Sequence, residues 1–267
     1  MKITIITSCF NRASTLEGAI KSVLEQDYPE IEYIIVDGAS KDGSLDVIKK
    51  YEEYCKSKDF VSKHPSFSFR YMSEPDHGMY EGINKGLRMA TGDVVGLVHS
   101  DDFLFSNHTI SDLVDEFKKT GADFVFGDGL FVNAKDISIP VRNWIGGEYR
   151  LWKVRHGWLP LHPTCYIRRE VMLKKGFYNE TYKIAADSDF LFRYLLPGDL
   201  SVAYLQEYIV RMRMGGLSTD SAKRKLMWKE DIRMFRSHGL SPICTKIEKM
   251  LWKVPQFITA KFHIKNI

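Results

Sequence analysis

Two adjacent carboxylates follow a short apolar run, in the segment His99-Ser100-Asp101-Asp102. Neighbouring carboxylates at the end of a buried strand repel each other unless a cation or a helix N-terminus neutralises them. Mg²⁺ and Mn²⁺ prefer one or two carboxylates, with diphosphate oxygens and water as the remaining ligands. Asp101 and Asp102 are therefore candidate metal ligands. The alternative is a solvated Asp-Asp turn that caps the following helix.

Other polar clusters follow apolar runs in the same way. They are Thr7-Ser8-Cys9-Phe10-Asn11-Arg12, Asp37-Gly38-Ala39-Ser40 and Glu74-Pro75-Asp76-His77-Gly78. In an open parallel sheet the carboxyl ends of the strands face a common crevice, where ligands bind. A carboxylate such as Asp37 could accept hydrogen bonds from a base or a ribose, or it could form only an Asx turn. Neither GxGxxG nor GxxxxGK[ST] occurs, which disfavours a dinucleotide-binding or P-loop enzyme.

Alternating apolar runs and helical periods predict the elements that position these clusters. We expect strands over residues 2–7, 32–36, 67–72, 94–98 and 122–126, and helices around 16–24, 47–54, 80–87 and 110–117. A capping box from Ser14 to Glu17 would begin the first helix, and Asn107 or Thr109 would cap the last. This alternation predicts an α/β fold with a mainly parallel central sheet flanked by helices. In the second half, helical periodicity returns only at 190–196 and after 222.

Taken in order, these motifs resemble the family-two glycosyltransferases of the Rossmann-like GT-A fold. The resemblance is carried by Ser8-Cys9-Phe10-Asn11-Arg12, Val36-Asp37-Gly38-Ala39-Ser40-Lys41-Asp42-Gly43-Ser44, Asp76-His77-Gly78-Met79-Tyr80-Glu81-Gly82-Ile83-Asn84-Lys85-Gly86, Ala90-Thr91-Gly92-Asp93, His99-Ser100-Asp101-Asp102, His162-Pro163-Thr164, Ala186-Asp187-Ser188-Asp189-Phe190 and Gly215-Gly216-Leu217-Ser218. It implies an inverting transfer of a hexosyl or N-acetylhexosaminyl group from a nucleotide-diphosphate donor, a UDP-sugar, to an acceptor hydroxyl.

The resemblance also implies roles for individual residues. The nucleotide would be bound by Ser8, Phe10, Asn11, Asp37, Asp76 and His99. Asp101 and Asp102 would hold Mn²⁺ or Mg²⁺, whereas His99 replaces the first aspartate of the family's metal motif. Many relatives place a histidine ligand where this chain has Arg211-Met212-Arg213-Met214. Arg211 or Arg213 would then neutralise the diphosphate directly, and the alternative is that both are surface arginines.

Asp187 matches the catalytic aspartate of the family. An inverting transfer needs a base on the acceptor side of the anomeric carbon and stabilisation of the departing diphosphate on the other side. Asp187 is therefore expected to take the proton of the acceptor hydroxyl. Asp189 is the rival base, or else a helix N-terminal acid favoured by the dipole. Trp158 and His162, in an aromatic and Pro-rich loop, are expected to line the acceptor, although a single tryptophan more commonly packs its own loop.

Composition limits the alternatives. The chain has 267 residues, 44% of them hydrophobic and 27% charged, as in globular proteins. It shows no secretory pattern, no membrane-spanning apolar run and no metal-binding cysteine spacing, so a cytoplasmic protein is expected. A haloacid-dehalogenase-like phosphatase would need a DxD motif where Ser8-Cys9-Phe10-Asn11 stands. A non-catalytic nucleotide- or glycan-binding module on the same fold is the alternative function.

The basic charge is concentrated at the C-terminus. Residues 221–267 contain eleven Lys and Arg against three acidic residues, among apolar positions at helical spacing: Ile243, Ile247, Met250, Leu251 and Val254. Such a segment is typical of contact with an anionic membrane rather than with nucleic acid, and the alternative is a helix that packs on the core.

We therefore expect two regions in the chain. Residues 1–220 would form the GT-A domain, with about 1–130 for nucleotide-sugar binding and 131–220 for the acceptor and the base. Residues 221–267 would form a basic amphipathic helical extension. The family resemblance adds a lipid-linked or oligosaccharide acceptor at the inner face of the cytoplasmic membrane, in O-antigen, capsule or exopolysaccharide biosynthesis.

Overall fold

The computed structural model describes residues 1–215, 224–254 and 256. Its strands are β1 (Ile3–Cys9), β2 (Ile31–Asp37), β3 (Ser68–Ser73), β4 (Val94–Leu97), β5 (Phe103–Leu104), β6 (Phe124–Val132), β7 (Pro140–Trp144), β8 (Tyr166–Arg168) and β9 (Val202–Arg213). Its helices are α1 (Ala13–Leu24), α2 (Ser44–Lys56), α3 (Lys58–Lys63), α4 (Met79–Met89), α5 (Thr109–Thr120), α6 (Leu151–Arg155), η1 (His162–Thr164), α7 (Arg169–Lys175), α8 (Ala186–Leu195), α9 (Arg224–Ser237) and α10 (Pro242–Leu251). The motif residues Gly216-Leu217-Ser218 and the terminal residues 257–267 lie outside the described part.

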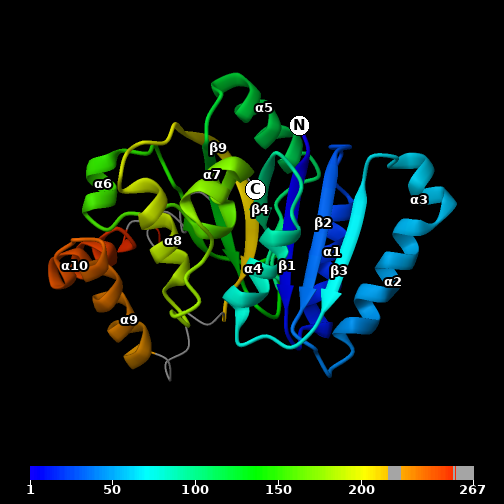
Figure 1. Ribbon diagram of the computed structural model, residues 1–267, viewed down its shortest axis with the longest axis horizontal. Helices are drawn as coiled ribbons and strands as arrows, with labels where there is room; N and C mark the ends of the chain where they lie inside the picture. Colours follow the sequence, from blue (N-terminus) through cyan, green and yellow to red (C-terminus); the bar gives the residue numbers. More distant parts are fainter. Residues whose placement is uncertain (216–223, 255, 257–267) are drawn as a thin grey trace.

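One sheet runs through the molecule in the order β3-β2-β1-β4-β8-β6-β9-β5, with β7 beside β6 (Figure 1). β1 pairs in parallel with β2 and β4, and β2 pairs in parallel with β3. β8 is antiparallel to both β4 and β6, so β6 and its parallel neighbour β9 run in the same direction as β1. The carboxyl ends of these long strands therefore lie at one edge. The predicted α/β fold with a mainly parallel sheet is confirmed.

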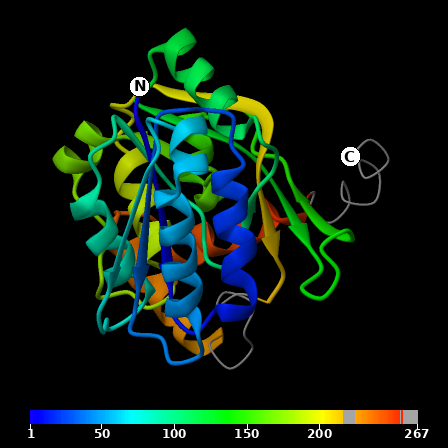
Figure 2. The same ribbon diagram turned by 90° about the vertical axis from the view of Figure 1, so that its right-hand side faces the viewer.

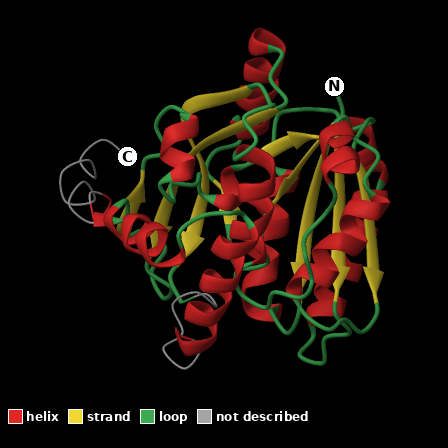
Figure 3. Ribbon diagram, turned by 60° about the vertical axis from the view of Figure 1, so that its left-hand side comes forward, coloured by secondary structure: helices red, strands yellow, loops and turns green. Residues whose placement is uncertain are grey.

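Helices cover both faces of this sheet, as the secondary-structure colouring makes plain (Figure 3). Because successive strand residues point to opposite faces, the core forms two layers. Ile5 of β1 belongs to the layer that contains Leu16 of α1 and Ile110 of α5, and Figure 2 looks onto α1 and α2 on this face. Ile6 belongs to the other layer, with Ile83 of α4 and residues of α8.

The starts of two helices differ from the prediction. α1 begins at Ala13, ahead of the expected capping box, and the N–H of Ala13 donates to Asp42 Oδ2 at 2.9 Å. α5 has His108 as its N-cap and no side-chain cap, so neither Asn107 nor Thr109 has that role. Asp42 lies in the loop after β2, and local spacing cannot predict a cap that another loop supplies.

The C-terminal helices α9 and α10 lie together at one end of the molecule, next to α8 (Figure 1). α9 packs on the core through Phe235, whose ring centroid is 5.8 Å from that of Phe192 in α8. α10 is different, because the predicted apolar residues in it and just after it are 52% to 65% exposed: Ile243, Ile247, Met250, Leu251 and Val254. Among the described residues, no helix has the length and apolarity needed to cross a bilayer.

Candidate active site

Ser8, Phe10 and Asp76 come together where β1, β2 and β3 end. Gly38 leaves space for two of them, because a Cβ there would lie 2.7 Å from Asp76 Oδ2 and 3.2 Å from the Phe10 ring. Gly82 of α4 does the same, since its Cβ would lie 2.6 Å from Ser8 Oγ. Phe10 is 58% exposed, so its ring is available to stack on a planar base. These predicted nucleotide residues therefore share one polar and aromatic surface.

Asp37 and Asn11 hold the loops around this surface. Asp37 is fully buried, and its carboxylate accepts hydrogen bonds from Ser40 N at 3.1 Å and Ser73 Oγ at 2.7 Å. Asn11 has a left-handed backbone, with φ of 51°, and its Oδ1 accepts a hydrogen bond from Lys41 N at 2.9 Å. These contacts favour the turn-forming interpretation of Asp37 and give Asn11 a similar role.

Asp102 lies after β4 with only 2% of its surface exposed. Its Oδ1 accepts a hydrogen bond from Arg213 N at 3.2 Å, whereas Oδ2 is buried without a hydrogen-bond partner among the described residues. Burial, and next the charge of Asp101, raise the pKa of Asp102 well above its ordinary value. A buried carboxylate oxygen without a partner, beside the half-buried Asp101, fits a divalent cation. In the described part of the chain, no group of three His, Cys, Asp or Glu side chains surrounds such a site.

Arg211 and Arg213 of β9 lie next to this acidic turn. β5 directly follows the turn, and its Phe103 pairs with Arg211 in the antiparallel ladder. The guanidinium of Arg211 lies 4.5 Å from the ring centroid of Phe105, and that of Arg213 lies 5.3 Å from the centroid of Phe103. The Nε atoms of both arginines are buried without a hydrogen-bond partner among the described residues. The backbone N–H and the charge of Arg213 therefore act on Asp102, and Arg211 lies on the same strand two positions away.

Asp187 is half-buried in the first turn of α8, and its Oδ1 accepts a hydrogen bond from Ser188 N at 2.6 Å. Burial raises the pKa of Asp187, whereas the charges of Lys249 and His99 lower it. Burial lowers the pKa of His99, and the charges of Asp101 and Asp187 oppose that shift. The ring geometry agrees, because the His99 ring lies 6.2 Å from that of His162, and the His162 ring lies 6.3 Å from that of Phe190 in α8. His99 therefore lies between the acidic turn after β4 and the start of α8.

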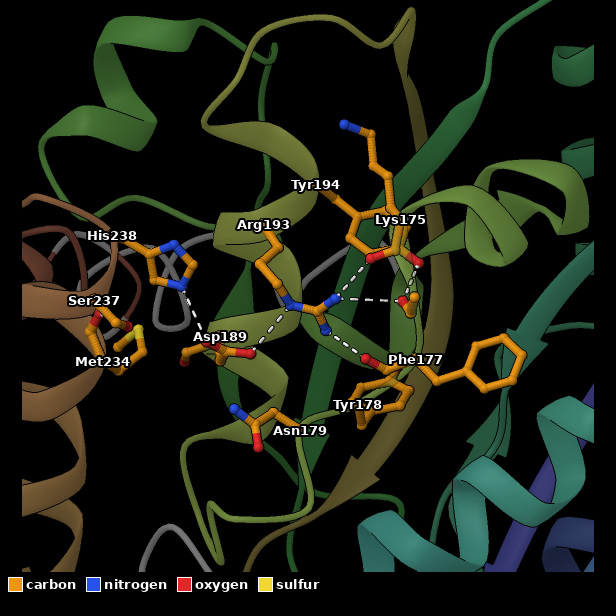
Figure 4. Close-up of polar contacts among 12 residues, drawn as sticks. Lys175, Phe177, Tyr178, Asn179, Asp189, Arg193, Tyr194, Met234, Ser237 and His238 are labelled. Carbon is orange, nitrogen blue, oxygen red and sulfur yellow. Dashed lines mark hydrogen bonds and ion pairs between the residues drawn. The ribbon is translucent and has the colours of Figure 1, made fainter.

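Asp189, the rival base, is buried, and both of its carboxylate oxygens have partners. Its oxygens bind Arg193 Nε at 3.2 Å and His238 Nε2 at 3.0 Å (Figure 4). Arg193 also donates to the carbonyl oxygens of Lys175 and Phe177. This network joins α8 to the end of α7 and the residues that follow it, and to the residue directly after α9. It favours the interpretation of Asp189 as a structural acid.

Trp158 and His162 are also largely buried. Trp158 is 6% exposed and packs with Phe126, at 5.8 Å between ring centroids, so the structure favours loop packing over an acceptor contact. His162 Nε2 lies 2.6 Å from Tyr178 Oη, and its ring stacks on His99 at 6.2 Å. Burial, and next the charge of His99, lower the pKa of His162 to about 3, so this ring is neutral. His162 is therefore a neutral ring that packs against His99.

Lys249 and Asp231 belong to the basic C-terminal segment, and the charges of both act on Asp187. Lys249 Nζ is 3.1 Å from Ser188 Oγ and 3.3 Å from Asp231 Oδ1. Lys249 and Ser188 are 61 positions apart in the chain. No local pattern relates them, because the packing of α10 creates the contact.

Sequence comparison identifies the family. The family model described as glycosyl transferase family 2 matches residues 4–181. An uncharacterized glycosyltransferase of Mycobacterium tuberculosis strain H37Rv is 28% identical over 199 residues, which cover 72% of this chain and 68% of that protein. A PGL/p-HBAD biosynthesis glycosyltransferase of Mycobacterium bovis strain BCG is 24% identical over 226 residues, which cover 84% of this chain and 82% of that protein.

Structural comparison gives the same fold. S. aureus TarS 1–349 in complex with UDP-GlcNAc superposes with a TM-score of 0.70 and 18% identity, over 97% of this chain and 79% of that one. The mannosyltransferase PcManGT from Pyrobaculum calidifontis, in complex with GDP-Man and Mn²⁺, superposes with a TM-score of 0.65 and 18% identity, over 97% and 73%. The GT-A expectation is confirmed. Because the family model matches about two thirds of the chain, from β1 to the residues before α8, the chain belongs to glycosyl transferase family 2 and is a glycosyltransferase.

Proposed function

We propose that this glycosyltransferase moves a sugar from a nucleotide-diphosphate donor, a UDP-sugar, to a hydroxyl of a growing lipid-linked glycan, with inversion at the anomeric carbon. The observation that carries the proposal is the position of His99, whose ring stacks on His162 next to Phe190 of α8 and on which the charges of both Asp101 and Asp187 act. A donor whose diphosphate is held by a cation at Asp101 would have its anomeric carbon between that cation and Asp187. The bound UDP-GlcNAc of TarS, and the GDP-Man and Mn²⁺ of PcManGT, support a nucleotide-sugar donor and a metal.

Each group has a defined part in this displacement. Ser8, Phe10 and Asp76 bind the nucleoside, and Asp187 accepts the proton of the acceptor hydroxyl as its oxygen attacks the anomeric carbon. The bond from that carbon to the diphosphate oxygen breaks at the same time. A divalent cation at Asp101 and Asp102, when bound, stabilises the charge of the departing diphosphate. Arg211 and Arg213 add positive charge on that side.

A panel of nucleotide sugars tests the donor. We expect a UDP-sugar with Mn²⁺ to stabilise the protein against heat, by about 2.7 kcal/mol at a concentration a hundred times its Kd. Slow release of UDP, from transfer to water, should accompany the stabilisation. The measurements are thermal unfolding and nucleotide release. Stabilisation without any release would favour the non-catalytic binding module, and stabilisation by GDP-sugars alone would exclude UDP.

We also propose that the segment 221–267 acts as an extension of the 1–220 domain and lies on an anionic membrane, where the lipid-linked acceptor is anchored. The apolar residues of α10 are exposed, and so are Leu226 and Trp228 of α9. Lys225, Lys229 and Arg236 line the same surface of α9 as Trp228. An exposed apolar face bordered by lysine and arginine complements an anionic lipid surface better than a neutral one.

Vesicle sedimentation tests this surface. We expect the double variant Ile247→Glu/Leu251→Glu to lose at least about tenfold in binding to phosphatidylglycerol vesicles, since burying each side chain is worth ~1.5–3 kcal/mol. Both positions are exposed in α10, so folding should be unaffected. The matched control is Val61→Glu/Leu173→Glu, which alters exposed apolar residues of α3 and α7. Equal binding by the two double variants would exclude this membrane surface. Equal binding of the natural protein to phosphatidylcholine and to phosphatidylglycerol vesicles would exclude it too.

A further inference from the structure

We propose that Lys249 of α10 is a positioning residue of the catalytic site, which holds the first turn of α8 so that the carboxylate of Asp187 faces the acceptor hydroxyl. The inference rests on the proposed role of Asp187 as the base. It means that the C-terminal helix has two faces with different tasks. The outer face is apolar and exposed, and the inner face reaches the site.

The contacts of Lys249 form a short chain to the base. Its ammonium group donates to Ser188 Oγ at 3.1 Å, and Ser188 N donates to Asp187 Oδ1 at 2.6 Å. On its other side Lys249 binds Asp231 Oδ1 at 3.3 Å. Asp231 is buried and also binds the ammonium group of Lys246. Lys249 is thus held between a buried carboxylate and the turn that carries the base.

α10 is seated on the loop after α6 by specific contacts. Gly157 has φ of 78°, and a Cβ there would lie 2.8 Å from the carbonyl oxygen of Thr245 and 3.2 Å from Lys249 N. Only glycine allows the helix to approach this closely. The neighbouring His156 makes two more contacts with this part of the chain. Its Nδ1 lies 2.9 Å from Glu248 Oε1, and its carbonyl oxygen accepts a hydrogen bond from Trp252 Nε1 at 2.9 Å. The seat is therefore built from backbone, ion-pair and hydrogen-bond contacts.

The charges around Asp187 explain why a cation is needed there. Burial raises the pKa of Asp187, and the nearby Asp231 of α9 raises it further. Lys249 of α10 and His99 lower it, while Tyr80 of α4 and Tyr178 also face its charge. Without Lys249, two carboxylates would remain close in a buried region with less compensation. Asp187 would then keep its proton to higher pH and would be a base over a narrower range.

Substitution of Lys249 tests the inference on the full chain, with hydrolysis of the nucleotide sugar that stabilises the protein as the assay. Lys249→Met is expected to lower kcat by about tenfold or more, a change equal to one pKa unit. KM for the donor should change less than about twofold, because the nucleotide surface lies at β1, β2 and β3. The acidic limb of the kcat/KM profile should move to higher pH. Lys249→Arg should recover most of the rate.

Two further variants separate this role from a general loss of fold. Lys49→Met removes the same charge from the exposed side of α2 and should leave kcat and the profile unchanged. Gly157→Ala should reproduce the Lys249→Met profile while every polar group of the site is retained. Unchanged kcat and profile in Lys249→Met, or a loss confined to donor KM, would overturn the inference. If Asp187→Asn also kept full activity, the proposed base itself would be wrong; if Asp187→Asn were inactive, only the role of Lys249 would fall.

Discussion

Sugar transfer by the Asp187→Asn variant is expected to be about 10²- to 10⁴-fold slower than by the natural protein, the usual contribution of a general base. Asparagine has nearly the same shape and keeps an oxygen to accept the hydrogen bond from Ser188 N, but it cannot take the proton of the acceptor. Nucleotide affinity should be nearly unchanged, because the side chains proposed to bind the nucleoside, Ser8, Phe10 and Asp76, lie where β1, β2 and β3 end and not on α8. Initial transfer rates and nucleotide titrations measure the two effects separately.

Asp189→Asn is the matched control, two positions along α8. It should lower the melting temperature, because it weakens the buried pairs with Arg193 and His238. The folded fraction should keep its transfer rate. A full rate in Asp187→Asn, or a loss of nucleotide affinity in place of rate, would contradict the assignment of Asp187 as the base.

The Asp102→Asn variant is expected to lose the effect of Mn²⁺ on nucleotide binding and about 10²-fold or more in transfer, while its thermal stability stays equal or rises. Oδ2 of Asp102 is buried with no hydrogen-bond partner among the described residues, so the ionised carboxylate costs stability when no cation is bound. An amide at this position keeps the oxygen that accepts from Arg213 N and carries no charge.

The pH dependence has a defined sign. The pKa of Asp102 is raised in the folded protein, so the folded state binds the proton more tightly than the unfolded state does. Without metal, the natural protein therefore loses stability as pH rises from the ordinary aspartate range through this raised pKa. The Asp102→Asn variant has no ionisable group at this position and does not lose this stability, so its stability relative to the natural protein should grow with pH. With Mn²⁺ the natural protein should become the more stable of the two, because the ion binds the ionised carboxylate.

Thermal unfolding at mildly acidic and neutral pH, with and without Mn²⁺, makes this measurement. Asp128→Asn is a suitable control, because burial also raises the pKa of Asp128. Its carboxylate, however, already accepts hydrogen bonds from Gly146 N at 2.8 Å and Tyr204 Oη at 2.9 Å. This control should lose stability and keep the response to Mn²⁺. A retained Mn²⁺ response in Asp102→Asn would show that the metal binds elsewhere.

Local patterns were sufficient for the fold class and for the edge at which the site forms. The strands expected at 2–7, 32–36 and 94–98 correspond to β1, β2 and β4, because buried parallel strands are continuous apolar runs in the sequence. The polar clusters that follow them meet because parallel strands end at the same edge. The sequence did not predict β8 and β9, since these strands lack a regular alternation and are specified by their partners β4 and β6.

The choice between alternative roles required the contacts of distant residues. The sequence offered both Asp187 and Asp189 as the base, with Asp187 preferred through the family resemblance. Of these two carboxylates, Asp189 is the one that Arg193 and His238 contact among the described residues, whereas Lys249 approaches Asp187 through Ser188. Trp158 is a core residue because Phe126 covers it.

α10 shows the same limit most clearly. Its helical period was visible in the sequence, yet whether the apolar face packs or is exposed depends on the seat at Gly157. Spacing along a chain shows which residues share a face of a helix. Whether a side chain is buried, and which charges act on it, depends on residues that packing brings near. These contacts assign each candidate residue its role in this glycosyltransferase.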